Sequence, residues 1–387
     1  MTHPTVRLAD VATVERATVE PSNIPEGSLY VGLENIERGG RLLDVRPTID
    51  GQLDSVKYRF SNSHVLFGKL RPYLAKIARP TFTGFCSTEI LPIRPGPRLD
   101  KNYLAHYLMQ PKVIDLATSR SAGANLPRLS PSELVKFQLP LPPIDEQRRI
   151  ANILDSADAL RAKCGEAITH LDALTRSMFL DMFGDTTRLS CWPVADFGDL
   201  IGDTRLGLIR NSESFGHDFQ TPYVRMNAIT AKGELSSLGL QRTSVSSSEL
   251  EVYALRPGDL LFNTRNSREL VGKSALVEED SGWVFNNNLM RIRLLPDVNP
   301  QYMAQLLLSD YGAQQLDRRK SGTTSVFAIY YKDLRSLQVP VPPISLQKAF
   351  GDRRATIVRL RTGYRRQGST LDALVSSLQD SAFKGKL

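Results

Sequence analysis

The sequence has little of what marks several protein classes. Only three of its 387 residues are cysteines, Cys86, Cys164 and Cys191, and they form no Cys-x-x-Cys pair. Their odd number and wide spacing argue against a disulfide framework or a structural zinc site, so we expect no bound metal and a reducing, cytoplasmic location. The chain has no run of about 18 apolar residues and no apolar secretory core near its N-terminus. We therefore expect neither a membrane span nor a signal peptide.

Motifs of the common catalytic sites are also missing. The sequence has no G-x-G-x-x-G after a strand-like run, no G-x-S-x-G and no H-E-x-x-H, and its five histidines are far apart. Val271–Ser274 resembles the end of a phosphate-binding loop, but Ser267 stands where that motif requires glycine. We can assign no catalytic residue, which favours a binding protein over an enzyme.

The sequence does contain an internal repeat. Leu134–Gln147 and Leu334–Gln347 share Leu, Gln, three prolines, Ile and Gln at an offset of 200 residues. Upstream segments pair at a slightly different offset, such as Tyr30–Ile36 with Tyr223–Ile229. A changing offset means loop insertions between matched elements. The pattern therefore indicates duplication of a whole globular unit together with its tail.

Each tail is predicted to be a long helix with a heptad seam. In the first tail apolar residues recur in alternating steps of three and four, which is typical of a coiled coil. The positions expected to line the seam are Ile150, Ile153, Leu160, Leu171, Leu174 and Met178 in the first tail, and Ile357, Leu360, Leu371, Leu374 and Leu378 in the second.

Charge favours pairing of the two tails with each other. The first tail, 144–183, carries 5 basic and 7 acidic side chains, whereas 344–387 carries 9 and 3. Three glycines weaken the second helix, so we expect it to form only when packed on a partner. The alternative, that each tail packs on its own globular unit, stays open at this point.

The globular units are expected to be mixed α/β, because short strand-like runs alternate with turn residues and short helices. The predicted fold class is α+β: two similar α/β domains and two long helices forming a coiled coil, with a pseudo-twofold internal duplication. The predicted bounds are 1–143 for the first domain, 144–184 for the first long helix, 185–343 for the second domain and 344–387 for the second helix. The first domain is basic, with 18 basic against 13 acidic side chains, and the second is near neutral, with 17 against 18.

The combination of motif, helix and duplication resembles the specificity subunit of a Type I restriction-modification system. Leu139–Ala151 is close to the family pattern, whereas the second copy has Ser345 and Leu346 where the first has acids. The resemblance implies two target-recognition domains, each reading one half of a split, asymmetric site in double-stranded DNA. It also implies that the helices pair antiparallel and set the distance between the half-sites.

The resemblance further implies that the chemistry lies in partner proteins. Two modification subunits would bind S-adenosylmethionine and methylate adenine at N6, docked on the helical pair. Motor-nuclease subunits that use ATP and Mg can join such a complex. The chain itself would hold no cofactor and catalyse nothing.

Candidate DNA contacts follow from residue type and from the resemblance. Gly68–Tyr73 matches a family loop of the form K-[IL]-R-P-Y, and Lys and Arg suit phosphates whereas amides and hydroxyls also suit base edges. The candidates are Lys69, Arg71, Tyr73, Ser121, Gly123, Asn125 and Arg128 in the first domain, and Arg265, Asn266, Arg268, Lys320, Ser321, Thr323 and Thr324 in the second.

Two other classes stay open on the sequence alone. A stand-alone nuclease or methyltransferase with degenerate motifs would agree with the net charge of +8. A coiled-coil adaptor that ignores DNA would agree with the seam. Catalysis by the isolated chain would favour the first, and unchanged behaviour after charge reversal of Lys69 and Arg71 would favour the second.

Overall fold

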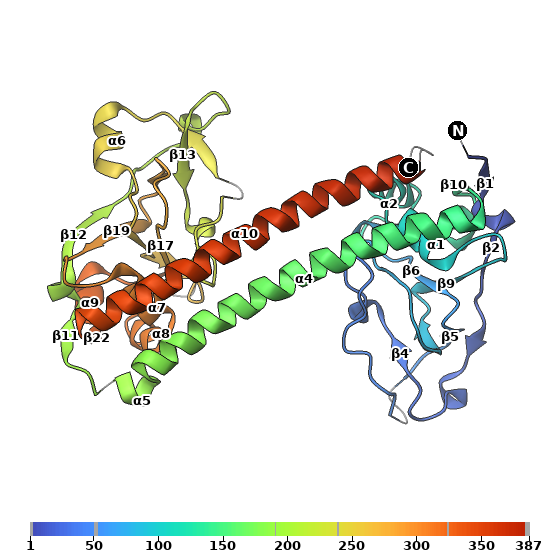
Figure 1. Ribbon diagram of the computed structural model, residues 1–387, viewed down its shortest axis with the longest axis horizontal. Helices are drawn as coiled ribbons and strands as arrows, with labels where there is room; N and C mark the ends of the chain where they lie inside the picture. The colour runs from blue at the N-terminus through green and yellow to red at the C-terminus, as the bar shows by residue number, and fades with distance from the viewer. Residues whose placement is uncertain (1–2, 50–52, 190, 238–239, 323–324, 384–387) are drawn as a thin grey trace. The chain divides into compact units, whose positions relative to one another are not determined.

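The computed structural model describes residues 3–49, 53–189, 191–237, 240–322 and 325–383. The chain forms two compact units, one from Met1–Gly165 with Arg365–Leu387 and the other from Glu166–Tyr364. Each unit combines a globular part with parts of two long helices, α4 (Ile144–Phe183) and α10 (Ile344–Phe383), shown in Figure 1. Among the described residues, no helix combines the length and the apolar character needed to cross a lipid bilayer.

The globular part of the first unit is built on an antiparallel sheet with strand order β2-β9-β6-β7. All four residues of the central strand β6 are buried, as its apolar sequence predicts. A second sheet, β3-β5-β8-β4, surrounds a smaller core. The strands are β1 (Thr5–Arg7), β2 (Ala12–Val14), β3 (Thr18–Val19), β4 (Tyr30–Val31), β5 (Lys57–Phe60), β6 (Val65–Gly68), β7 (Ile77–Ala78), β8 (Gly84–Ser87), β9 (Ile90–Pro95) and β10 (Gln138–Pro140), and the short helices are α1 (Lys101–Leu108), α2 (Pro111–Ser119) and α3 (Pro131–Leu134).

The second unit repeats this plan with the strand order β12-β19-β15-β17. In both units a short strand also pairs with the strand that leads into the long helix, β1 with β10 and β11 with β22. The strands are β11 (Val194–Asp196), β12 (Ile201–Leu206), β13 (Thr221–Val224), β14 (Gln241–Thr243), β15 (Leu260–Asn263), β16 (Arg265–Asn266), β17 (Ser274–Leu276), β18 (Val284–Phe285), β19 (Leu289–Leu294), β20 (Ser321–Gly322), β21 (Phe327–Ala328) and β22 (Gln338–Pro340), and the short helices are α5 (Thr186–Leu189), α6 (Ser247–Tyr253), α7 (Pro300–Leu308), α8 (Asp310–Asp317) and α9 (Tyr331–Arg335). The predicted mixed α and β class with internal duplication is confirmed.

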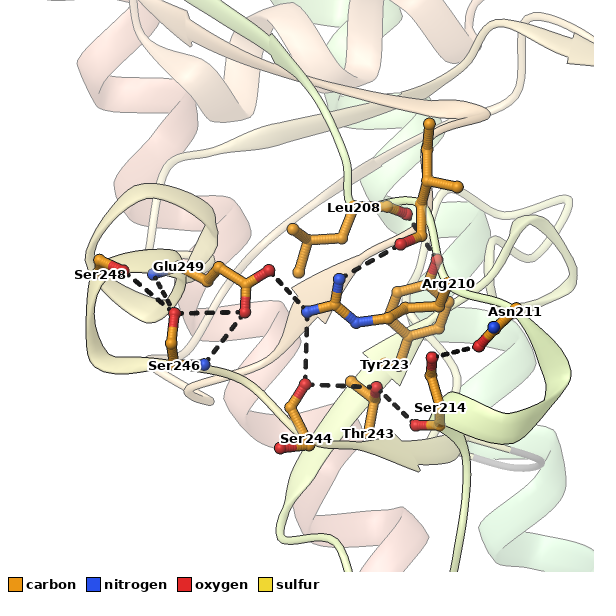
Figure 2. A network of polar contacts seen from close by, with 11 residues as sticks. Leu208, Arg210, Asn211, Ser214, Tyr223, Thr243, Ser244, Ser246, Ser248 and Glu249 are labelled. Carbon is orange, nitrogen blue, oxygen red and sulfur yellow. Dashed lines mark hydrogen bonds and ion pairs between the residues drawn. The ribbon is translucent and has the colours of Figure 1, made fainter.

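The units differ most in their second sheets. In the second unit β14-β13-β18 is joined to α6 by the polar network of Figure 2. Arg210 donates to a carboxylate oxygen of Glu249 at 2.8 Å and to the carbonyl of Ser244 at 3.3 Å. Glu249 also accepts from the backbone N–H of Ser246, so the arginine and the helix start are fixed together.

The repeated Pro-Pro-Ile-x-x-Gln motif starts each long helix by anchoring it to the globular part. Gln147 is fully buried, and its Oε1 accepts from the backbone N–H of Asp100 at 2.8 Å. Its Nε2 donates to the carbonyls of Pro142 at 2.8 Å and Arg98 at 2.9 Å. Gln347 makes the equivalent bonds to the N-cap residue of α7 and to the proline of the second motif. The motif therefore ties the first turn of each long helix to the helix that covers its sheet.

The long helices pair antiparallel within each unit. In the first unit Ile150 and Leu154, near the start of α4, share a core with Phe383 at the end of α10. In the second unit Phe179, near the end of α4, packs edge-on against Phe350 near the start of α10, with ring centroids 5.6 Å apart. Both cores also contain residues of the sheet and its covering helices. Helix pairing and packing on the globular part therefore occur together.

Four predicted seam residues do not line the seam. The side chains of Leu160, Leu174, Leu360 and Leu374 are 47% to 52% exposed. The remaining seam residues are buried or half-buried, namely Ile150, Ile153, Leu171, Met178, Ile357, Leu371 and Leu378. A straight helix has 3.6 residues per turn, so a strict heptad stripe drifts around it, and the buried stripe moves one residue on, to Leu154 and Val375.

The middle of the pairing is polar. In the first unit Arg161 Nε lies 2.6 Å from Asp372, and in the second Arg361 Nη1 lies 3.2 Å from Asp172. These two pairs are equivalent under the 200-residue offset and fix the register of the helices. The division of the chain at residues 143, 184 and 343 stays a prediction.

Candidate nucleic-acid interface

Two segments proposed separately as DNA contacts lie side by side in the first unit. The backbone N–H of Arg71 donates to the carbonyl of Pro127 at 2.7 Å, and that of Leu129 donates to the carbonyl of Lys69 at 2.9 Å. The backbone of Arg128 forms isolated antiparallel β-bridges with both Leu70 and Ala122. We call Lys69–Tyr73 with Ser121–Arg128 the paired loops of the first unit.

Local backbone geometry explains the shape of these loops. Gly123 has φ +107°, which disfavours any residue with a Cβ, and it turns the chain back toward Arg128. Arg71, directly before Pro72, has a backbone in the left-handed helical region, with φ +50°. Its exposed side chain therefore stands at a tight corner instead of continuing strand β6.

The polar side chains of these loops fall into two groups. Lys69 and Arg71 have no ion pair with any residue that the structure describes, so their charges are available to a phosphate. Arg128 donates from Nε to Glu89 at 2.9 Å, and the Ser121 hydroxyl donates to the carbonyl of Ala117 at 2.8 Å. Three further candidates lie exposed in the loops: Tyr73, Gly123 and Asn125.

The second unit builds the same frame. Strand β21 pairs with both β16 and β20, so that Ala328 lies opposite Arg265 on one side and Ser321 on the other. The N–H of Thr264 bonds to the carbonyl of Asn288, as that of Lys69 bonds to Glu89 in the first unit. We call Arg265–Arg268 with Lys320–Gly322 and Ser325–Ala328 the paired loops of the second unit. Two candidates, Thr323 and Thr324, lie outside the described residues.

Most candidate side chains of the second unit are held in place. Asn266 accepts from the N–H of Ser267 at 2.9 Å, and the Ser321 hydroxyl donates to the carbonyl of Ala328 at 3.3 Å. Arg268 and Lys320 share the carboxylate of Asp317, at 3.7 and 3.3 Å. Arg265 is exposed and forms no ion pair within the described chain.

Equivalent backbone positions carry unlike chemistry in the two units. The first unit has Lys69 and Arg128 where the second has Thr264 and Ala328, and Leu70 where the second has Arg265. Asp317 and Phe327, which contact Arg268, were not among the predicted residues. Their contacts depend on α8 and β21 meeting in space, and no local sequence pattern indicates this.

Charged groups also join each globular part to the long helices. In the first unit Asp155 accepts from Arg79 at 2.5 Å and from His106 at 2.8 Å. Burial alone would raise the pKa of Asp155, but hydrogen bonds from His106 and Arg79 hold it below its usual value. Among the described residues, no three His, Cys, Asp or Glu side chains gather as a metal site requires.

In the second unit the corresponding links run to both helices. Asp172 of α4 pairs with Lys232 at 2.5 Å, and Arg361 of α10 pairs with Glu234 at 2.5 Å. Burial acts to raise the pKa of Asp172, and hydrogen bonds from Lys232 and Arg361 lower it overall.

The first half of the chain matches a known family. The model of the Type I restriction modification DNA specificity domain covers residues 4–169. The specificity subunit of the type I restriction enzyme EcoKI, from Escherichia coli K12, is 26% identical over 330 residues, which is 79% of this chain and 69% of that protein. The EcoDI specificity subunit from Escherichia coli is 25% identical over 183 residues, 46% of this chain, and the match spans 40% of the relative's length.

Two solved structures share the fold over nearly the full chain. The S subunit of a Type I restriction-modification system from M. genitalium superposes with a TM-score of 0.63 at 13% identity, covering 98% of this chain and 96% of that one. A chain from a structure of an assembled type I R-M system gives a TM-score of 0.57 at 19% identity, with coverage of 100% and 98%. The resemblance seen in the repeated motif is therefore confirmed: residues 4–169 match the Type I restriction modification DNA specificity domain, and the chain shares the fold of solved S subunits.

Proposed function

We propose that this chain reads a split, asymmetric site in double-stranded DNA, one half with each unit. The observation that carries the proposal is the frame of paired loops, built twice on the same backbone plan with different side chains. Two copies of one frame suit two stretches of one duplex, and unlike side chains suit unlike half-sites.

The long helices are proposed to set the distance between the half-sites. A helix of 40 residues is about 60 Å long, and a rigid helix fixes a separation better than a flexible linker does. The duplicated pairs Arg161–Asp372 and Arg361–Asp172 support a fixed register.

The four exposed leucines are proposed to receive two modification subunits. Leu160 and Leu374 each come one residue before a residue of the helix contact, Arg161 and Val375, so both are turned about 100° in the same sense. In an antiparallel pair the same turn places both side chains on one flank. Leu174 and Leu360 are placed equivalently in the second unit. Each unit thus offers one apolar patch that suits a partner helix.

The chemistry is proposed to lie outside this chain. The modification subunits would bring S-adenosylmethionine and methylate adenine, and a motor-nuclease subunit, where present, would use ATP and Mg. This chain would hold no cofactor. Serine substitution of Leu160 and Leu374 should weaken co-purification of the methyltransferase and leave thermal unfolding unchanged, because both side chains already face solvent.

Selection from a random duplex library tests DNA reading directly. The full chain, alone and with the methyltransferase of its host, should enrich a motif of two unlike halves at a constant spacing. Binding should weaken with salt, log K falling by about 0.9 per neutralised phosphate for each unit of log salt. Enrichment of no motif in either preparation would contradict the proposal. Methylation or cleavage of DNA by the isolated chain would instead support a stand-alone enzyme.

A further inference from the structure

Arg268 of the second unit is exposed, and an acid and an aromatic ring beside it favour one orientation of its side chain. Its guanidinium lies 3.7 Å from the carboxylate of Asp317 and 5.6 Å from the centre of the Phe327 ring. The other oxygen of Asp317 lies 3.3 Å from Lys320 Nζ, and the Lys320 side chain is only 15% exposed. A largely buried lysine therefore pairs with one oxygen of this carboxylate, and the other oxygen faces the exposed arginine.

Arg210 of the same unit is a structural arginine and serves as a comparison for Arg268. Its side chain is 15% exposed, and it donates to Glu249 and Ser244, as Figure 2 shows. It also donates to the carbonyl of Ile209. Arg268 is 58% exposed, and no described residue accepts a hydrogen bond from its guanidinium. Its donors are therefore free to bond a ligand, although its orientation is already set.

Orientation distinguishes base reading from phosphate binding. A phosphate needs only a nearby positive charge, which Lys69 and Arg71 of the first unit supply without any partner that would fix them. Guanine presents O6 and N7 in the major groove as two acceptors that match the planar guanidinium fork. A guanidinium that is already oriented loses less entropy when both bonds form.

We propose that Arg268 reads a guanine in the half-site of the second unit, with Asp317 and Phe327 as its positioning residues. The inference rests on the proposed DNA reading and adds a named base to it. The first unit has no such acid in the last turn of α2, Leu116–Ser119, and its loop arginine Arg128 is instead paired with Glu89. The two units thus pair their loop arginines with acids from different elements.

Charge-conserving substitution separates the two roles of an arginine. Arg268→Lys keeps the positive charge but loses the fork, so it should lower the preference for one guanine of the second half-site about 10- to 100-fold. Preferences at the other positions and the salt dependence should stay as in the wild type. The matched control is Arg318→Lys, at an exposed arginine for which the described residues provide no ion pair.

Asp317→Asn tests positioning. It should relax the same guanine position several-fold while strengthening binding to unrelated duplex, because a negative charge near the DNA is removed. Asp310→Asn, at an exposed residue of the same helix, changes charge equally without touching Arg268 and should leave the preference intact. Melting curves of each variant confirm that it is folded.

The outcomes separate this inference from the proposed function. If Arg268→Lys enriches the wild-type motif at every position, Arg268 reads no base and the inference is overturned. If Asp317→Asn leaves the guanine preference unchanged, the positioning role is overturned. A wild-type chain that enriches no motif would overturn the proposed function itself.

Discussion

The two units attach the same globular plan to the long helices with different sets of ion pairs: the described pairs of the first unit use a helix acid, and those of the second unit use a helix acid and two helix bases. In the first unit the helix provides the acid, Asp155, and the globular part provides the base, Arg79. In the second unit Asp172 of α4 likewise pairs with the base Lys232, but α10 also provides a base, Arg354, to the acid Glu278 of the globular part, 2.7 Å away. The backbone frame is thus duplicated, whereas the charges that join it to the helices are not. The additional helix bases of the second unit, Arg354 and Arg361, contribute to the positive charge of the second long helix.

Reversing the charge of Arg354 in the Arg354–Glu278 pair should have the largest effect on the free energy of unfolding. Arg354 is 8% exposed, so Arg354→Glu places a second carboxylate beside Glu278 in a nearly dry contact. We expect a loss of about 3 kcal/mol in the free energy of unfolding, measured by urea denaturation. The double variant with Glu278→Arg should recover most of it. Arg79→Glu should cost less, since that pair is more exposed and Asp155 keeps His106. Equal losses in the two units would contradict the asymmetry.

Loss of the buried glutamine, Gln147 in the first unit or Gln347 in the second, should instead destabilise both units in the same way. Gln147→Ala leaves one N–H and two carbonyls without their buried partner, which we expect to cost about 2 to 3 kcal/mol in unfolding free energy. Gln347→Ala should also be costly, because it loses the equivalents of two of these three bonds. Gln138→Ala, at an exposed side chain, is the control. A harmless Gln147→Ala would mean that the motif does not anchor the helix.

The glutamine anchors also show which features of the fold could be predicted from the sequence. The repeated proline and glutamine motif predicted both helix starts, because the bonds from Gln147 to Pro142 and from Gln347 to Pro342 lie within that short segment. The bonds to Asp100, Arg98 and Asn299 could not be predicted from it. The heptad pattern predicted pairing but misplaced Leu160 and Leu374, since drift of the 3.6-residue turn cannot be read from apolar spacing alone. Asp317 could not be predicted beside Arg268, because that contact depends on how α8 packs against the paired loops.

DNA binding should depend unequally on the two sets of paired loops. Lys69 and Arg71 carry charges with no partner in the described structure, so their joint replacement by alanine should reduce the slope of log K against log salt by about 1.8. Arg265→Ala alone should reduce it by about 0.9 and act on the second half-site. The measurement is fluorescence anisotropy of a labelled duplex over a salt series. An unchanged slope in the double variant would place the first unit's contacts elsewhere.

The smallest expected effect is on stability in acid, to which Asp155 of the first unit and Asp172 of the second contribute through different partners. The folded pKa of Asp172 lies below its ordinary value of 3.8, so its contribution to stability is present at neutral pH and is lost as the pH falls from about 4 through the folded pKa. Asp172→Asn should therefore lower the unfolding free energy at pH 7 and flatten its decline in acid.

Asp155→Asn should act in the same direction, because its pKa is lowered too. The effect of Asp172→Asn should exceed it, since Asp172 joins α4 both to Arg361 of α10 and to Lys232 of the globular part. Among the described residues, the partners of Asp155 are Arg79 and His106, both in the globular part of its unit. Urea unfolding at steps between pH 7 and pH 3 measures both. A larger effect at Asp155 would show that the links to the globular parts, and not the polar centre of the helical pair, carry the acid sensitivity.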